Sequence, residues 1–306
     1  MENFTDKNPK SKIWPNFFIV GAPKAGTTSL YEYLNNVPEI FMSSVKEPYY
    51  FARNLVQKDD PILKPITDKE QYLALFKRAS NKKVIGEASV HYLADSDAPK
   101  LIHEVSPSAK ILISLRDPVE RQFSEYLMLY SRGLLKKSFR EEIDNSIYLK
   151  EKYIESYLRL NSGLYSENIT NYIDIFGKEN IKIIIFEEWR NNPKTTLENI
   201  LKFLNINWKI KEFTPEIFNK YEGNKIPRGY ITKYILQNEE SINISKYLLP
   251  KKSREFIKKI LMKQEEKPKM NDVDRKFLQN YYHNDVEKLK KILKRELPWK
   301  NFSNTK

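Results

Sequence analysis

The residues best suited to chemistry lie in a loop bounded by two glycines near the N-terminus. The stretch Asn16–Leu30 reads NFFIVGAPKAGTTSL: a short apolar run, then the loop from Gly21 to Gly26, then three hydroxyl residues. Backbone amides of such a loop, and the N-terminus of the helix that should follow it, attract anions. The sequence therefore predicts a phosphate-binding loop, with an ordinary strand-to-helix turn as the alternative.

The position of the lysine distinguishes this loop from a Walker A loop. The glycine spacing is that of Walker A, but Thr27 stands where Walker A has its lysine, and Lys24 lies inside the loop instead. A Walker lysine reaches the β- and γ-phosphates, and the hydroxyl beside it binds magnesium. A cation placed earlier in the loop suits a shorter phosphate chain that binds beside the loop.

A second candidate anion ligand, Arg116, directly follows the strongest strand pattern of the chain, KILISL at Lys110–Leu115. Ser124 lies further on, in a helix that should open at Pro118, because proline suits the first helical turn. If this strand is parallel to the first apolar run, both end at the edge where open α/β sheets bind ligands. Arg116 could then hold a second phosphate; an ion pair with Asp117 is the alternative.

The elements that position these residues alternate between strands and helices over the first 205 residues. Strand patterns occur at Phe17–Val20, Lys83–Glu87, Lys110–Leu115 and Ile181–Phe186. Helical patterns follow the first loop and occur at Asp68–Phe76, Pro99–Val105, most of Ser138–Phe176 with a break at Ser162 and Gly163, and Pro193–Leu204. Pro38–Phe51 reads as an aromatic-rich loop. The alternation predicts an α/β fold with a mainly parallel sheet of four or five strands.

The pattern changes from Trp208 onward, where turns mix with short helices. Lysine-rich amphipathic helices are predicted at Ser253–Met262 and His283–Glu296. A solvated helix face is the ordinary explanation of such lysines, and a polyanion site is the alternative. We expect one domain over residues 16–300, with a helical C-terminal region, after an N-terminal extension of residues 1–15.

Composition limits the classes of partner. The 306 residues include 53 Lys and Arg against 40 Asp and Glu, a net charge of +13, which favours anionic ligands. No nucleic-acid motif accompanies this charge, so we expect no nucleic-acid partner. Cysteine is absent and the three histidines lack metal-ligand spacing, so neither disulfides nor a metal site are expected.

Membrane insertion is not expected either. No window of the sequence approaches the roughly 18 to 20 apolar residues that a membrane-spanning helix needs. The polar stretch MENFTDKNPKSKIWPN contains no apolar segment of the kind found in signal peptides. The sequence therefore predicts a cytoplasmic protein.

Four stretches together resemble the PAPS-dependent sulfotransferases, in which PAPS is 3'-phosphoadenosine 5'-phosphosulfate. They are PKAGTTSL (23–30), KEPYYF (46–51), GEAS (86–89) and LRDPVERQFSEYLM (115–128). They look most like the branch that contains heparan-sulfate sulfotransferases and their bacterial relatives. The later IIIFEEW stretch and the ending at 269–299 are also similar to that branch. The resemblance implies a P-loop nucleotide-kinase-like three-layer sandwich.

The resemblance also implies roles for individual residues. The 5'-phosphosulfate would be bound by the loop residues Lys24, Ala25, Gly26, Thr27 and Thr28, with Ser29 as a further candidate. The 3'-phosphate would be bound by Arg116 and Ser124, and by a basic loop nearer the C-terminus for which Arg228 is the candidate. Glu47 of the KEP motif would be the catalytic base, and Lys24 would stabilise the departing phosphate. The family requires no metal for this transfer.

The implied activity is transfer of a sulfuryl group from PAPS to a hydroxyl or amine, most plausibly of a saccharide or glycan. Tyr49 replaces the histidine that often follows KEP in the glycan-sulfating branch, and Ala88 replaces a lysine that often follows the GE pair. Those positions face the acceptor in that branch, which leaves the acceptor open. The alternatives are a P-loop nucleotide kinase or NTPase, and a non-catalytic basic protein that binds polyanions.

Overall fold

The computed structural model describes residues 13–56, 63–79, 81–135, 137–151, 159–208, 225–227, 262–264 and 266–303. The chain divides into two compact units. The first combines residues 1–121, 161–218 and 281–306, and the second combines residues 122–160 and 219–280. The predicted site residues Lys24, Glu47 and Arg116 belong to the first unit. Ser124 belongs to the second unit, and Arg228 lies outside the described residues.

A five-stranded parallel sheet forms the centre of the first unit, in the order β2-β3-β1-β4-β5. The strands are β1 (Phe17–Gly21), β2 (Ile40–Met42), β3 (Val84–Ala88), β4 (Lys110–Leu115) and β5 (Ile181–Ile185). Every residue of β1 is buried, as expected for a central strand covered on both faces. This sheet confirms the predicted α/β fold and its parallel strands.

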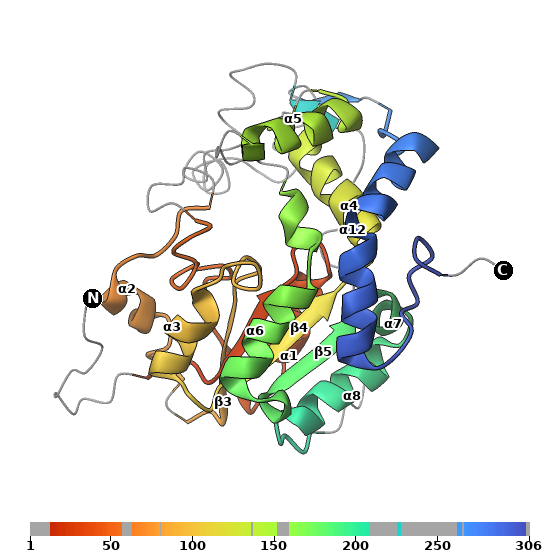
Figure 1. Cartoon of the computed structure of the whole chain (residues 1–306). Helices are drawn as coiled ribbons and strands as arrows, with labels where there is room; N and C mark the ends of the chain where they lie inside the picture. The colour runs from red at the N-terminus through yellow and green to blue at the C-terminus, as the bar shows by residue number, and fades with distance from the viewer. Residues whose placement is uncertain are drawn as a thin grey trace. The chain divides into compact units, whose positions relative to one another are not determined.

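Helices cover both faces of the sheet. Side chains of α1 (Thr27–Asn35) and α8 (Pro193–Phe203) share one hydrophobic core with Phe17 and Ile19 of β1. Helices α3 (Ala98–Val105) and α6 (Ser166–Phe176) lie in front of the sheet in Figure 1 and contact each other. The first unit is therefore built in three layers, as the resemblance implied.

Several element boundaries differ from the sequence predictions. The aromatic loop contains the short strand β2, and Phe186 opens a helix, α7 (Phe186–Asn191), instead of ending β5. Helix α12 (Asp272–Leu293) begins well before the predicted start at His283. The predicted helix at 253–262 lies outside the described residues except for Met262, which begins β7 (Met262–Gln264) opposite β6 (Lys225–Pro227). The remaining helical elements of the described residues are α2 (Lys69–Ala74), α4 (Pro118–Ser131), α5 (Phe139–Glu151), η1 (Leu160–Gly163) and η2 (Lys178–Asn180).

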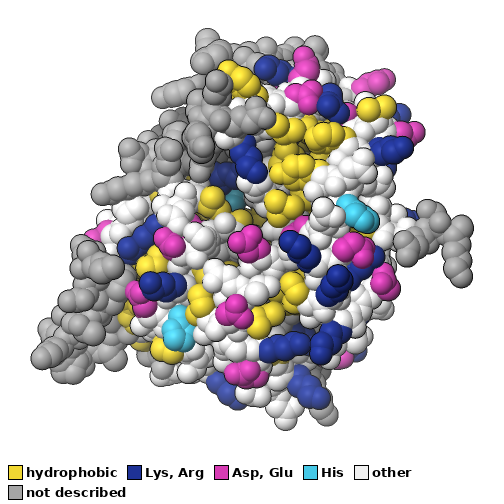
Figure 2. Space-filling view, viewed as in Figure 1, with side chains coloured by type: hydrophobic (Ala, Val, Ile, Leu, Met, Phe, Trp, Pro, Cys, Tyr) yellow, Lys and Arg dark blue, Asp and Glu magenta, His cyan; other side chains and the backbone are white. Residues whose placement is uncertain are grey.

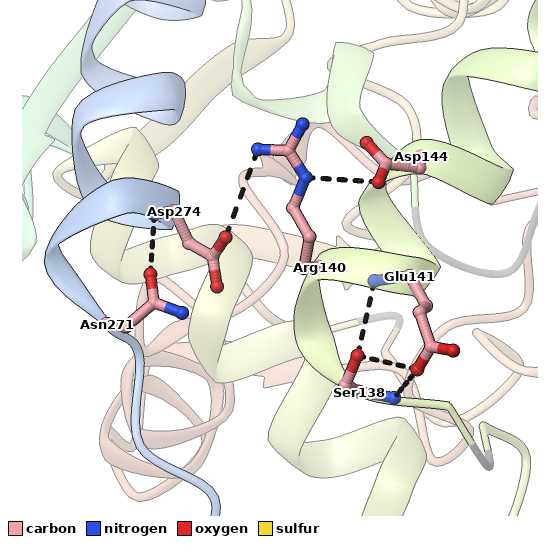
Figure 3. Close-up of polar contacts among 6 residues, drawn as sticks. All are labelled: Ser138, Arg140, Glu141, Asp144, Asn271 and Asp274. Atoms are coloured by element: carbon pink, nitrogen blue, oxygen red, sulfur yellow. Dashed lines mark hydrogen bonds and ion pairs between the residues drawn. The ribbon is translucent and has the colours of Figure 1, made fainter.

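Within the second unit, a reciprocal cap begins α5 (Phe139–Glu151), as Figure 3 shows. Glu141 Oε2 accepts hydrogen bonds from the Ser138 amide at 2.9 Å and the Ser138 hydroxyl at 2.6 Å. The Glu141 amide donates to Ser138 Oγ at 3.4 Å. Both residues thereby satisfy amides at the start of the helix, where no intrahelical acceptor is available.

An ion-pair bridge joins this helix to the first turn of α12, whose first residues also belong to the second unit. Arg140 contacts Asp144 on its own helix at 3.0 Å and Asp274 of α12 at 4.0 Å. The Asp274 amide donates to Asn271 Oδ1 at 2.7 Å, so Asn271 caps α12. Figure 3 shows Arg140 between the two aspartates.

The described surface mixes both charges. On the face drawn in Figure 2, Lys and Arg side chains are interspersed with Asp and Glu side chains. Across the described part of the chain, none of the helices combines the length and the apolar character needed to cross a bilayer.

Candidate active site

The loop after β1 is held against β4 by Ser114. The Ala22 amide donates to the Ser114 carbonyl at 2.6 Å, and the Ser114 hydroxyl donates to the Ala25 carbonyl at 2.7 Å. Ser114 is fully buried. One residue of the neighbouring strand therefore fixes both ends of the turn that carries Lys24.

Gly26 ends the loop in a conformation that only glycine adopts without strain. Its φ is 77°, and it caps α1. A Cβ placed there would lie 2.3 Å from Trp189 Cζ2 and 2.9 Å from Phe186 Cε2, both on α7. The aromatic side chains of α7 thus pack directly against the loop. In the sequence, these residues lie in the FEEW part of the IIIFEEW stretch.

Helix α1 begins at Thr27 directly after Gly26, and the side chains of Thr27 and Ser29 are buried while Thr28 is partly buried. The first amides of any α-helix have no intrahelical acceptor, and the helix dipole places positive charge there. Lys24, partly buried and with φ of 65°, stands one turn before this helix. These features suit the binding of a phosphate group.

Arg116 reaches the same loop from the end of β4. Its Nη1 donates a hydrogen bond to the Lys24 carbonyl at 3.0 Å, and its guanidinium lies 5.0 Å from the centre of the Phe186 ring. Its Nε is buried and has no hydrogen-bond partner among the described residues. Burial lowers the pKa of Arg116, and the nearby Glu187 and Glu120 oppose that shift. The structure therefore brings Arg116, which follows β4, into contact with the backbone of the loop that carries Lys24.

Glu47 lies beside the end of β3, the other neighbour of β1. Its amide donates to the Ala88 carbonyl at 2.8 Å, and Ala88 pairs with Ile19 of β1. Lys46 Nζ and the Tyr49 hydroxyl both donate to its carboxylate. Its side chain remains 30% exposed, so it is accessible to solvent.

The surroundings of Glu47 favour its ionised form. Burial raises its pKa, but Lys46, Tyr49 and His91 together outweigh burial, and the pKa lies below its usual value. The rings of Tyr49 and His91 pack with centres 5.4 Å apart. Tyr49, the departure from the related motif, is thus a direct partner of Glu47, and His91 is a neighbour that sequence reasoning did not assign to the site.

The remaining predicted residues are placed as follows. Ala25, Gly26, Thr27, Thr28 and Ser29 form the loop end and the first turn of α1 with Lys24. Ser124 is partly buried on α4 (Pro118–Ser131), within the second unit, and Arg228 is outside the described residues. The described residues contain no group of three or more His, Asp or Glu side chains arranged to hold a metal ion.

Comparisons with known proteins identify the family. A family model of the sulfotransferase domain matches residues 15–292. Mouse carbohydrate sulfotransferase 15 is 30% identical over 254 residues, covering 65% of this chain and 45% of that protein. Mouse bifunctional heparan sulfate N-deacetylase/N-sulfotransferase 4 is 27% identical, covering 92% of this chain and 30% of that protein. The chain therefore spans less than half the length of these two relatives.

The fold agrees with a solved relative. The crystal structure of a sulfotransferase from Alicyclobacillus acidocaldarius has a TM-score of 0.70 and 27% identity, covering 93% of this chain and 98% of that one. This likeness and the family match over most of the chain are consistent with each other. The chain belongs to the sulfotransferase domain family.

Proposed function

We propose that this sulfotransferase transfers a sulfuryl group from PAPS to a hydroxyl or amine of a saccharide. The main observation that supports PAPS as the sulfuryl donor is the contact of Arg116 with the Lys24 carbonyl, in a loop suited to bind an anion. Arg116 also keeps a buried Nε without a protein partner among the described residues. A guanidinium held beside a phosphate loop fits a nucleotide that carries phosphate at two positions.

When bound, PAPS supplies the sulfuryl group and a phosphate leaving group. Lys24 and the amides of the first turn of α1 are suited to stabilise negative charge on that phosphate. Glu47 accepts the proton that the acceptor loses as its oxygen or nitrogen bonds to sulfur and the bond from sulfur to the phosphate oxygen breaks. Because the lowered pKa keeps Glu47 ionised, it is ready to take that proton.

The proposed acceptor class rests on the relatives and on the residues near Glu47. The names of both curated relatives describe action on carbohydrate or heparan sulfate, which supports a saccharide. Tyr49 and Ala88 occupy the two positions at which the chain departs from the glycan-sulfating branch. We therefore propose a saccharide acceptor. We expect its contacts near Tyr49 to differ from those in the glycan-sulfating branch.

A screen of saccharide acceptors tests the proposal. The purified protein is incubated with PAPS and each acceptor, and mass spectrometry records the mass gain of one sulfate. Glu47→Gln is the matched control, because it removes the base and keeps the shape of the side chain. The proposal expects a sulfated product that depends on PAPS and nearly disappears in the control. Sulfation undiminished in Glu47→Gln would overturn the role of Glu47, and no product with any acceptor would overturn the activity.

The cytoplasmic location predicted from the sequence is kept here as a proposal. It is supported by the lack of cysteine in the sequence. Fractionation of the cells that make the protein tests it, with recovery in the membrane fraction as the contradicting result.

A further inference from the structure

A second carboxylate, Glu87, lies behind the loop that carries Glu47, and the proposed transfer does not use it. Glu87 is on β3 and is fully buried. Its Oε2 accepts hydrogen bonds from the Tyr72 hydroxyl at 2.6 Å and the Tyr92 hydroxyl at 3.2 Å. Its Oε1 has no partner among the described residues. Burying a carboxylate costs free energy unless the carboxylate accepts hydrogen bonds. The burial of Glu87 and the contacts it makes therefore call for an explanation.

One hydroxyl connects Glu87 to the loop of Glu47, and a second lies beside it. The Tyr92 oxygen accepts a hydrogen bond from the Phe51 amide at 3.2 Å, and the Tyr92 hydroxyl donates to Glu87. Ser89 Oγ accepts from the Tyr49 amide at 3.1 Å, and the Ser89 side chain is near enough to Glu87 to lower its pKa. A hydroxyl that donates to a carboxylate keeps its lone pairs for an amide, so Glu87 orients the Tyr92 oxygen toward the loop.

We propose that Glu87 is a positioning residue: through Tyr92 its carboxylate fixes the backbone that holds Glu47 in place for proton transfer. The bridged amide belongs to Phe51, and the Tyr49 amide donates to Ser89 Oγ; both residues follow Glu47 closely in the chain. Tyr49 is also the residue whose hydroxyl donates to Glu47. The inference rests on the proposed role of Glu47 as the base.

Protonation of Glu87 should loosen this arrangement in the neutral range. Burial raises the pKa of Glu87 to about 7, against the opposing hydrogen bonds from Ser89, Tyr72 and Tyr92. The titratable groups that face it are Tyr72 from α2, Tyr92 after β3, and Tyr172 from α6, which is near enough to interact with its charge. A protonated carboxyl accepts hydrogen bonds more weakly, so the positioning is lost as the pH falls through about 7.

Tyr92→Phe and Tyr72→Phe form a matched pair for the test. Each variant removes one hydroxyl that donates to Glu87 and keeps the ring, but only Tyr92 bridges to the loop. At a pH well above the pKa of Glu87, where its carboxylate is ionised in every variant, we expect kcat for sulfuryl transfer to fall about tenfold in Tyr92→Phe, with KM for PAPS changed less than about twofold and little change in Tyr72→Phe. For wild type we expect kcat to fall as the pH decreases through about 7. Glu87→Gln should lower kcat and abolish this fall. Equal losses in both tyrosine variants, or an unchanged profile in Glu87→Gln, would overturn the inference.

A second measurement separates this inference from the proposed function. Amide hydrogen exchange of the peptide that covers residues 49–51, followed by mass spectrometry, needs no substrate. The inference expects faster exchange of this peptide in Tyr92→Phe and in Glu87→Gln than in wild type and Tyr72→Phe. Exchange that is equal in all four proteins would overturn the positioning role, whatever the activity. Failure of the sulfation screen with this exchange pattern intact would instead overturn the activity alone.

Discussion

Arg116 Nη1 donates a hydrogen bond to the backbone carbonyl of Lys24 at 3.0 Å. This contact joins the end of β4 to the loop after β1, and it places two cations on adjoining segments at one edge of the sheet. The guanidinium is further fixed by the ring of Phe186. A side chain held in this way is preorganised, so binding an anion requires little further ordering.

Replacing Arg116 should weaken binding of the bisphosphorylated nucleotide that remains after transfer, 3',5'-bisphosphorylated adenosine (PAP). Arg116→Lys keeps the charge but loses the planar fork that contacts the loop and the ring. We expect the Kd for PAP to rise about tenfold or more, as for loss of one hydrogen bond to a charged group. Isothermal titration calorimetry measures it. Arg190→Lys is the control, because Arg190 also lies over Phe186, at 5.6 Å, but is exposed; an equal loss there would contradict the assignment.

Adding a methyl group at Gly26 should damage the loop. Gly26→Ala places a Cβ 2.3 Å from Trp189 Cζ2 and also strains a φ of 77°. Gly177→Ala is matched in φ, at 76°, but its Cβ would meet the side chain of Glu179. We expect Gly26→Ala to lower the free energy of unfolding by about 1 to 3 kcal/mol more than Gly177→Ala, because aromatic rings cannot move aside as a glutamate can. Chemical denaturation measures the free energy of unfolding of both variants. Equal losses would show that the packing of Trp189 against Gly26 is unimportant.

Much of the fold followed from local patterns. The bounds of β4 were predicted correctly because KILISL is an isolated apolar run between polar residues. The strand β2 was missed because its three residues lie in an aromatic-rich loop without alternation, and their pairing partner Val84 is far along the chain. Helix α7 was missed because its first residue, Phe186, continues an apolar run that looks like the end of a strand.

The candidate site, too, was predicted from the sequence only in part. Lys24 and Arg116 were predicted to lie at the same edge of the sheet because both follow parallel strands; the structure places Arg116 nearer than that, in contact with the Lys24 carbonyl. The bond from Tyr72 to Glu87 could not be predicted, since it depends on how α2 packs on the sheet. Likewise, nothing in local periodicity indicates that Trp189 fills the space that Gly26 leaves open.

The stability of the first unit should depend on the charge of Asp117. Burial raises the pKa of this carboxyl to about 6, against hydrogen bonds from Asn301 and the amides of Glu120 and Val119. Between about pH 4, where an unfolded aspartate titrates, and about pH 6, the folded state binds a proton that the unfolded state does not. The contribution of Asp117 to the free energy of unfolding therefore decreases as the pH rises through this window.

Asp117→Asn tests this dependence. The asparagine oxygen can still accept from the Val119 amide, as Asp117 Oδ1 does at 3.0 Å, but it does not titrate. We expect the unfolding free energy of wild type, minus that of the variant, to be larger at pH 4 than at pH 6. Urea denaturation at both pH values measures the difference. A difference that stays constant or grows with pH would contradict the raised pKa.

Neutralising Lys24 should slow transfer more than it weakens folding. Lys24→Ala removes the cation that would stabilise charge on the leaving phosphate, and loss of one such donor lowers kcat by roughly a hundredfold or more. Lys100→Ala, on the exposed side of α3, is the control for loss of one positive charge. Initial rates of PAPS-dependent sulfation measure both variants. A similar small decrease in the two would show that Lys24 acts only through net charge.

Neutralising Glu47 should separate catalysis from donor binding. Glu47→Gln removes the proton acceptor, so kcat should fall by roughly a hundredfold or more, within the usual range for general base catalysis. The Kd for PAP should stay close to that of wild type, because the variant leaves the loop of Lys24 intact. Glu104→Gln, exposed on α3, is the control. A large loss of PAP affinity in Glu47→Gln would instead place Glu47 in the donor site.

The central claim is that the loop of Lys24 and Arg116 binds an adenosine nucleotide with phosphates at its 3' and 5' positions and needs no metal to do so. Isothermal titration calorimetry with PAP in EDTA, beside titration with ATP and magnesium, tests it most directly. The account predicts saturable binding of PAP in EDTA that is lost in Arg116→Ala. Tight binding of ATP with magnesium, with no heat from PAP, would contradict it and favour a nucleotide kinase or NTPase.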